Sequence, residues 1–520
     1  MKKRNTSTSG NMQYPTHSVR EVNIDGTART PTFFRSAFLI LALVVASSSF
    51  GCGDWAEFGN GPTNPHNSVV KGPEIGAPIQ IPLIPASAPW FGGETSVLVD
   101  RQGDYYVSSL NSEIEVYDHS GVWKGAYNLG IAGPRAAPYV ESRFRSRWST
   151  IFTGATGGGG GFHAINVNKA TSTYTMTAVS DASTGPSESS PKRAKDRTLY
   201  ICDVAGTVHR YKYIPGASPS LKHLNSIALG HEVRGAIALY DLYDGNDQED
   251  RGEEVLVATT DGYFFVLDHE LNTIIWYDSS GASPVMGDNY YAGVTVGERS
   301  PLAPVALLPI ADDFYAGLYG PNSGKLRAID LVAQSVDWEL TPSNTTAGQD
   351  ALMGSVAILF DQTQFNTPGN GTIDPGDNPT GGIDVGGGDL NNGIDLGGNG
   401  SGGDGWDPAS GNTSPYHATF ASTDRYLYGV DIVTGLEIWD YNMVAGGYDA
   451  PVVDATNVIY VGDGRTFIHA VEGKSSCAGC GIWVDPTLTL GGYLNPVKLG
   501  ITKHRGLVVG STATATAIFQ

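Results

Sequence analysis

The sequence predicts an all-β protein whose main part is a β-propeller of about eight four-stranded blades. Three observations support this prediction: glycine is abundant, at 68 of 520 residues, apolar residues (40%) outnumber charged ones (16%), and one short pattern recurs along the chain. Glycine reaches the positive φ of tight turns without steric cost, which suits many short strands. The apolar content is enough for a large core, and repeated units of about 50 residues are typical of propeller blades.

An apolar triplet that ends in Asp, followed eight residues later by Trp, is the most regular part of the repeat. The clearest copies are Val266–Asp268 with Trp276, Ala328–Asp330 with Trp338, and Gly429–Asp431 with Trp439. A stretched copy contains Trp483, and a shorter copy near the start contains Trp123. Apolar, strand-like runs precede the three clear triplets: Val255–Thr259, Tyr315–Tyr319 and His417–Ala421.

Each unit therefore reads as four short strands, of which the third carries the triplet and the fourth the Trp. Prolines recur at or near the first strand, at Pro138, Pro191, Pro304, Pro451 and Pro496. A single blade cannot bury both of its faces, so neighbouring blades must cover them. Each Trp is expected to dock between adjacent blades, where it can bury a large apolar area. The units are expected to start near residues 94, 135, 188, 232, 299, 350, 448 and 492.

The N-terminal segment has the pattern of a bacterial export signal. Basic residues precede the ten-residue apolar run Ala37–Ala46, which is shorter than the ~20 residues of a membrane-spanning helix and typical of a secretory signal. Small residues that end in Gly51-Cys52 follow and resemble a lipobox, with Ser49 in place of the usual Leu. Residues 1–51 are thus expected to be removed and Cys52 to be acylated. The alternative is ordinary cleavage near this point, which leaves an unmodified Cys52.

The negative charge of the chain excludes some classes of binding partner. The formal net charge is −21, and loss of residues 1–51 removes six basic and two acidic residues, so residues 52–520 carry 26 basic and 51 acidic residues, or −25. Such a surface repels nucleic-acid phosphates and anionic bilayers. We therefore expect no nucleic-acid partner, and attachment to the membrane through lipid at Cys52.

Three further cysteines have structural interpretations. In an oxidising compartment, Cys477 and Cys480 of the Cys-Ala-Gly-Cys loop are expected to form a disulfide. A zinc site would need a second ligand pair, and a thioredoxin-like motif would need a βαβ pattern; the sequence has neither. Cys202 ends an apolar run and is expected to be a small buried hydrophobe.

Two acidic segments are the candidate calcium sites. Residues 363–412 are rich in Gly and contain seven Asp but no Lys or Arg, a composition that predicts a disordered insert within blade six. Carboxylates also suit calcium, which makes Asp384 and Asp395 weak candidate ligands. The segment 241–250 adds a second weak set, and a solvated loop is the favoured interpretation there. Its candidate ligands are Asp241, Asp244 and Asp247.

The best-kept unit resembles a known repeat. Tyr426–Trp439 reads Tyr-Leu-Tyr-Gly-Val-Asp-Ile-Val-Thr-Gly-Leu-Glu-Ile-Trp and resembles the propeller repeat of pyrroloquinoline-quinone (PQQ) proteins. Trp55–Gly61 resembles the N-terminal segment of that family, and the resemblance covers about residues 54–520 outside the insert. The last unit ends at Gln520 without a Trp strand, and the segment around Trp55 is expected to supply this strand and close the ring.

The resemblance predicts the fold better than it predicts a cofactor. PQQ dehydrogenases hold the cofactor over a disulfide between adjacent cysteines, beside calcium and a catalytic Asp. This chain has no adjacent cysteines and no Cys-x-x-Cys-His haem motif, so neither a cofactor nor a catalytic residue is expected. The chain is similar to the propeller lipoproteins that assist outer-membrane protein assembly, which implies a scaffold with envelope-protein partners and a place on the outer membrane, on its periplasmic or surface side. The alternatives are a PQQ-dependent oxidoreductase and a calcium-binding adhesion propeller of the cell surface.

Overall fold

The computed structural model describes a set of segments that all lie in one compact unit, Cys52–Gln520. The sequence predictions for residues 1–51 and for the insert 363–412 fall outside these segments. The described residues are 63–65, 80–83, 97–109, 113–130, 137–142, 147–156, 160–216, 218–242, 252–280, 292–299, 303–311, 324–344, 352, 354–359, 417–443, 445–447, 450–463, 467–473, 481–485, 497–502, 506–511 and 516–519.

Eight antiparallel four-stranded sheets make up the described fold, and we number them in chain order. The first four are built from consecutive strands. Sheet 1 contains β2 (Leu98–Val99), β3 (Tyr105–Ser109), β4 (Glu113–Tyr117) and β5 (Trp123–Asn128). Sheet 2 contains β6 (Tyr139–Ser142), β7 (Trp148–Gly154), β8 (Phe162–Asn168) and β9 (Thr175–Asp181). Sheet 3 contains β10 (Lys192–Arg193), β11 (Thr198–Cys202), β12 (Thr207–Ile214) and β13 (Ser220–Ala228), and sheet 4 contains β14 (Ala238–Tyr240), β15 (Glu254–Ala258), β16 (Phe264–Leu267) and β17 (Ile274–Asp278).

The remaining four sheets continue this order until the last strand. Sheet 5 contains β18 (Thr295–Glu298), β19 (Pro304–Pro309), β20 (Leu326–Asp330) and β21 (Ser335–Leu340), and sheet 6 contains β22 (Ala357–Ile358), β23 (His417–Ala421), β24 (Tyr426–Asp431) and β25 (Glu437–Asn442). Sheet 7 contains β26 (Val452–Val453), β27 (Val458–Gly462), β28 (Ile468–Glu472) and β29 (Gly481–Asp485). Sheet 8 contains β30 (Val497–Thr502), β31 (Gly506–Ser511), β32 (Thr516–Phe519) and β1 (Gln80–Leu83).

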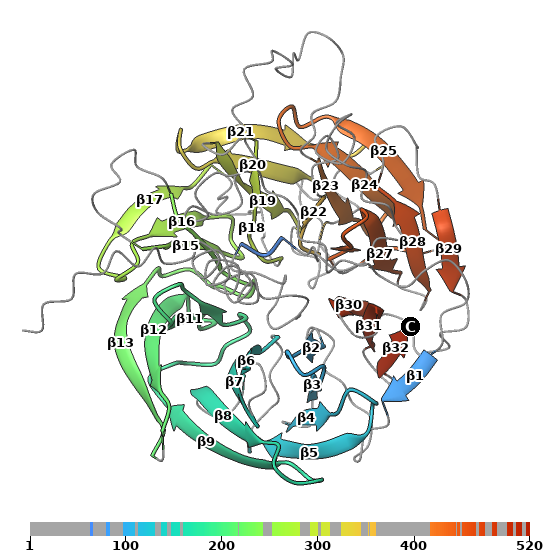
Figure 1. The fold of residues 1–520 in the computed structure, drawn as a ribbon. Coiled ribbons are helices and arrows are strands. Elements are labelled where there is room, and N and C mark those ends of the chain that lie inside the picture. Colours follow the sequence, from blue (N-terminus) through green and yellow to red (C-terminus); the bar gives the residue numbers. More distant parts are fainter. Residues whose placement is uncertain are drawn as a thin grey trace, which may run out of the picture. The chain divides into compact units, whose positions relative to one another are not determined.

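The sheets stand around a common centre, which makes the fold an eight-bladed β-propeller (Figure 1). The first strand of each sheet lies toward the centre and the fourth lies at the rim. First strands of successive sheets touch, as β10 with β14, β14 with β18, and β26 with β30 do. Contact between β30 and β2 joins the last sheet to the first and closes the ring. The predicted fold class and the number of blades are therefore confirmed.

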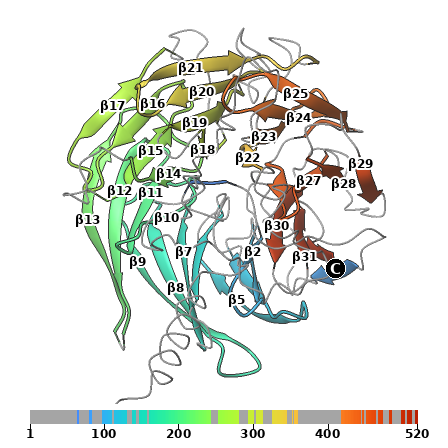
Figure 2. The ribbon, with the colours of Figure 1, turned by 45° about the horizontal axis from the view of Figure 1, so that its top comes forward.

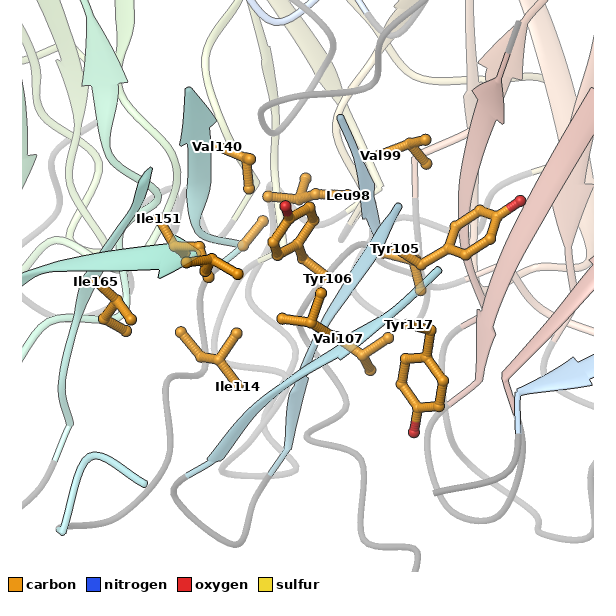
Figure 3. Close-up of a cluster of buried hydrophobic side chains, with 14 of the residues drawn as sticks. Leu98, Val99, Tyr105, Tyr106, Val107, Ile114, Tyr117, Val140, Ile151 and Ile165 are labelled. Carbon is orange, nitrogen blue, oxygen red and sulfur yellow. The ribbon is translucent and has the colours of Figure 1, made fainter. Parts of the chain in front are cut away.

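The core lies between neighbouring sheets. The middle strands are covered on both faces, so β15 of sheet 4 is buried along its whole length, whereas the outer strand β21 of sheet 5 alternates between exposed and half-buried residues. Figure 3 shows the cluster around sheets 1 and 2, where Ile151 and Ile165 of sheet 2 lie on the Ile114 side of sheet 1. Because each sheet packs against two neighbours, the blades stabilise one another.

The strand that completes the last blade differs from the prediction. The segment β1 pairs with β32 in the antiparallel register Gln80↔Phe519 to Leu83↔Thr516, and Figures 1 and 2 place it beside the C-terminal strands. The N-terminal region thus closes the ring, but with residues 80–83 instead of the segment around Trp55, which lies outside the described residues. Pro82 lacks an amide hydrogen, which an outermost strand tolerates.

Sheet 5 also differs from the prediction in one detail. Pro304 was expected at the first strand, but it begins the second strand, β19, and pairs with Glu298 of β18. The run Tyr315–Tyr319, expected as the second strand, lies outside the described residues. The first strand here is Thr295–Glu298, which reads only weakly as a strand because it ends in Gly-Glu.

None of the described elements is a helix, and none of them therefore has the length and hydropathy that a bilayer-spanning helix needs.

Candidate functional site

Turns that begin with Asp recur around the ring and use most of the buried carboxylates. In the turn Asp100–Asp104, the Asp100 carboxylate accepts hydrogen bonds from the backbone N–H groups of Gln102 (2.9 Å) and Asp104 (3.1 Å). The fourth residue, Gly103, has a φ of 86°, which glycine adopts without a steric cost. Asp203 and Asp454 accept backbone N–H groups in the same way. These carboxylates therefore fix the geometry of turns.

The second oxygen of each such carboxylate contacts the side chain six residues further along the chain. The two residues lie on the same face of a hairpin, because side chains of one face recur every second residue. The resulting pairs are Asp100 with Tyr106 (2.7 Å), Asp118 with Lys124 (2.9 Å), Asp203 with His209 (3.1 Å), Asp454 with Tyr460 (3.4 Å) and Asp463 with His469 (3.4 Å). Two acid–histidine pairs that could be taken for catalytic dyads, Asp203–His209 and Asp463–His469, thus belong to a repeated structural device.

A cluster of buried charges lies between sheets 1 and 2. Lys169 is 7% exposed and contacts the carboxylates of Asp100 and, at 2.7 Å, Asp104, which are 0% and 5% exposed. Its ammonium also lies 5.7 Å from the ring centre of Tyr106 and 6.0 Å from that of Tyr174, within range of cation–π attraction. Burial raises the pKa of Asp104 although Lys169 opposes the shift. The members satisfy one another, so the cluster joins two blades.

A second polar network joins sheets 3 and 4. His269 Nε2 lies 3.0 Å from Asp196, and Arg210 donates to Glu270 (2.5 Å) and Asp196 (3.4 Å). Burial disfavours the charged form of Asp196, but hydrogen bonds from Thr198 and His269 outweigh this effect and lower its pKa to about 2. Asp196 therefore stays ionised down to low pH and holds the strand connection in place.

A pair of histidines on sheet 3 was not singled out by the sequence. His209 Nδ1 lies 3.4 Å from His223 Nε2, and His209 Nε2 faces Asp203. Burial and the nearby His209 lower the pKa of His223. A bulge between Arg210 and Tyr211 shifts the pairing of β12 with β13, and sequence spacing alone does not foretell it. Across the described part of the chain, no group of three or more His, Cys, Asp or Glu residues could hold a metal ion.

The inner side of the ring is covered on three sheets by a short N-terminal segment. The backbone N–H of Val296 in β18 donates to Thr63 O (2.9 Å), and that of Ile358 in β22 donates to Pro65 O (2.8 Å). Between them Asn64, fully buried and with a φ of 53°, donates to the carbonyls of Ile237 (3.0 Å) and Val294 (2.7 Å). The segment appears in blue inside the ring in Figures 1 and 2. No pattern in the sequence predicts this segment.

Three of the predicted docking tryptophans lie between neighbouring sheets. Trp276 packs against a cluster drawn from sheets 4 and 5. Trp338 packs against sheet 6 and donates from Nε1 to Ile432 O (3.0 Å). Trp439 is 3% exposed within a cluster of sheets 6 and 7. The backbone of Trp483 lies in β29 opposite Ala470.

Trp123 does not take the position predicted for it. It is the first residue of β5, lies opposite Tyr117 and is 37% exposed. Gly125 occupies the place opposite Val116 that the tryptophans hold in sheets 4 to 7. The physical reason is a shorter turn: Trp123 follows Asp118 by five residues instead of eight, so the spacing cannot bring it into the buried register. The prediction that Trp123 docks between blades was wrong.

The candidate metal ligands and cysteines are only partly described. Asp241 is exposed and its carboxylate lies 2.9 Å from Lys195 Nζ. Cys202 is buried in β11, where burial and the neighbouring Asp203 raise the pKa of its thiol well above the ordinary value, so it is a poor nucleophile. The other predicted residues lie outside the described part of the chain: Cys52, Asp244, Asp247, Asp384, Asp395, Cys477 and Cys480.

Comparison with known proteins supports the fold and goes no further. No family model and no curated protein sequence matches this chain. The chain is similar to the crystal structure of Saccharomyces cerevisiae Sqt1, with a TM-score of 0.53 and 7% identity over 87% of this chain and 99% of that chain. It also matches the crystal structure of BamB from Moraxella catarrhalis, with a TM-score of 0.45 and 14% identity over 86% of this chain and 98% of that chain. At such identities the likeness concerns the β-propeller fold alone.

Proposed function

We propose that this protein is a non-catalytic binding propeller of the bacterial cell envelope, built from PQQ-type repeats and anchored by lipid at Cys52. The observation that carries the proposal is the segment Thr63–Pro65. A PQQ-dependent enzyme would use the central cavity, but here the chain itself lines the inner edges of β18 and β22 with hydrogen bonds. The role that the repeat implies is scaffolding of other envelope proteins, such as those that assemble outer-membrane proteins.

The polar clusters support the same proposal. The buried carboxylates of the Asp-initiated turns are used by backbone N–H groups and by the side chain six residues later. The Lys169 cluster is likewise satisfied by internal contacts. A catalytic acid or base needs a proton-transfer partner on the substrate, and these groups are instead committed to holding turns and blades together.

Calorimetric titration of the processed protein with PQQ in the presence of calcium tests the non-catalytic part. We expect no heat of binding, whereas a PQQ dehydrogenase measured alongside should bind stoichiometrically. Tight stoichiometric binding to this protein would overturn the proposal and show that the segment Thr63–Pro65 leaves room for the cofactor.

Fractionation of cells that express the full chain tests the anchor. We expect the wild-type protein in the detergent-soluble membrane fraction and the Cys52→Ser variant in the soluble envelope fraction. Circular dichroism of both purified proteins should be the same, because none of the described strands includes residue 52. A Cys52→Ser protein that stays in the membrane fraction would refute lipid attachment at this residue.

A further inference from the structure

The acid-paired histidine of sheet 3, His209, faces a second histidine. Its Nδ1 lies 3.4 Å from Nε2 of His223 on the neighbouring strand β13. The acid-paired histidine of sheet 7, His469, instead turns its Nδ1 toward the hydroxyl of Tyr441 at 3.3 Å. Sheet 3 thus brings two imidazole nitrogens together, and the structural role of the Asp-initiated turn does not require this.

A β-bulge aims His223 at His209. Leu224 is the extra residue of this bulge, so that His223 pairs with Tyr211. In a regular register, His223 would lie opposite Lys212 and on the other face of the sheet. The bulge therefore places His223 on the face that carries His209. Bulges that re-aim a side chain are over-represented beside functional sites.

The Asp203 carboxylate fixes the orientation of the His209 ring. It lies 3.1 Å from His209 Nε2, and the two side chains are 7% and 4% exposed. Burial opposes ionisation of Asp203, but hydrogen bonds from His209 and the Thr207 N–H outweigh this effect and lower its pKa. The carboxylate therefore accepts the Nε2 proton and leaves a lone pair on Nδ1. Histidines that bind metal ions almost always donate their other ring N–H to an oxygen acceptor in this way.

His223 can supply the second lone pair. Burial and the nearby His209 lower the pKa of His223, although Asp181 opposes the shift, and metal binding requires the neutral imidazole. The other titratable groups beside the pair are Asp203 and Tyr211, whose hydroxyl donates to Asp181 (3.3 Å). His223 is only half-buried in the outer strand, so an ion can reach it from solvent.

The spacing of the two nitrogens fits a shared metal ion. Hydrogen bonds from N–H to oxygen typically span ~2.7–3.2 Å, which is shorter than the 3.4 Å between His209 Nδ1 and His223 Nε2. A tetrahedral ion with bonds of about 2.1 Å to nitrogen holds two nitrogens about 3.4 Å apart. Zinc has this geometry and accepts imidazole ligands.

We propose that His209 and His223 bind one zinc ion between β12 and β13. The ion replaces the contact between the rings: His209 Nδ1 and His223 Nε2 become ligands, and the proton of His223 resides on its Nδ1. Within the described segments, no third His, Cys, Asp or Glu joins them, so water fills the remaining positions. The ion therefore bridges two strands and keeps positions open to a further ligand.

Calorimetric titration of the processed protein with zinc chloride, in excess calcium chloride, tests the proposal. Calcium occupies sites made of carboxylate oxygens, whereas imidazole suits zinc. We expect the wild type to bind one more zinc ion per chain than His223→Gln does. His209→Gln should lose the same ion, and circular dichroism should show that the half-buried His223→Gln variant folds as the wild type does.

His231→Gln is the matched control. His231 is also paired with a carboxylate, that of Asp261 at 2.7 Å, but its ring stacks on Tyr263 and not on a second histidine. This variant should bind as much zinc as the wild type. X-ray absorption at the zinc edge should show two imidazole nitrogens at ~2.0–2.1 Å together with oxygen ligands.

Several outcomes would overturn the zinc proposal. Equal zinc binding by wild type and His223→Gln, or equal loss in His231→Gln, would show that the histidine pair is not the site. Sulfur ligands in the absorption spectrum would assign the ion to Cys477 and Cys480, and oxygen ligands alone would assign it to the acidic surface. Absence of any zinc binding would leave the pair as a contact between two strands.

Discussion

Asp100 shows how single residues hold this fold together. Its carboxylate accepts hydrogen bonds from two backbone N–H groups and from the side chains of Tyr106, Ser149 and Lys169. Each carboxylate of this type joins a turn to a strand, and Asp100 also joins one blade to the next. The sequence shows Asp followed by Tyr, His or Lys at the sixth position, but that spacing gains meaning only when the hairpin register is known.

Removal of the Lys169 ammonium should destabilise the protein strongly. Lys169→Met leaves two buried carboxylates without their cation, and loss of one partner from a buried ion pair costs about 3–5 kcal/mol. The free energy of unfolding from urea titration measures the effect. Lys195→Met is the matched control: its pair with Asp241 is 72% and 51% exposed, and such pairs contribute only ~0–1 kcal/mol. Equal effects of the two substitutions would contradict the assigned role of the cluster.

The Asp196 carboxylate should contribute to acid sensitivity. Its pKa falls from the ordinary 3.8 to about 2 in the folded protein, so its contribution to stability is present above the unfolded value and is lost as the pH falls toward 2. In urea titrations over this pH range, we expect the difference in unfolding midpoint between wild type and Asp196→Asn to shrink as the pH falls. A difference that stays constant would argue against ionisation of Asp196 as its source.

At the scale of the strand, a repeated register explains the spacing that reveals the blades. In sheets 4 to 7, the first residue of the triplet lies opposite the Trp, as in Ala328↔Trp338 and Gly429↔Trp439, and a bulge follows at once. The sequence could predict these strands because the spacing is constant in sheets 4 to 6 and only stretched in sheet 7. It could not place Trp123, whose turn is shorter, or the first strand of sheet 5, which has too few apolar residues to stand out.

The stability of the protein should depend on the absence of a side chain at Gly429, because the Trp439 ring lies against this residue. A Cβ at residue 429 would lie 2.1 Å from Trp439 Cε2, so Gly429→Ala forces the indole to move. Overpacking of this kind costs about 1–3 kcal/mol, which thermal or urea unfolding would detect. The control is Gly216→Ala, because a Cβ there meets nothing within 4 Å. Unchanged stability of Gly429→Ala would mean that Trp439 is not fixed in the tight position described here.

At the scale of the whole molecule, the sequence predicted the ring but not the contacts that close it. Apolar patterning and repeat spacing are local properties, and they identify eight units. The pairing of β1 with β32 and the contacts of Thr63–Pro65 with sheets 5 and 6 join distant parts of the chain through a few residues without periodicity.

The most direct test of the closed ring is a disulfide across its final strand pair. Pro82 and Ala517 are Cα partners in β1 and β32, and directly opposed residues lie about 4.5–5.5 Å apart, within the range of a disulfide. Under mild oxidation, Pro82→Cys/Ala517→Cys should form this bond, identified by peptide mass mapping. Pro82→Cys/Ile518→Cys places the second thiol on the opposite face and should not. A bond only in the second pair, or in neither, would contradict closure by residues 80–83.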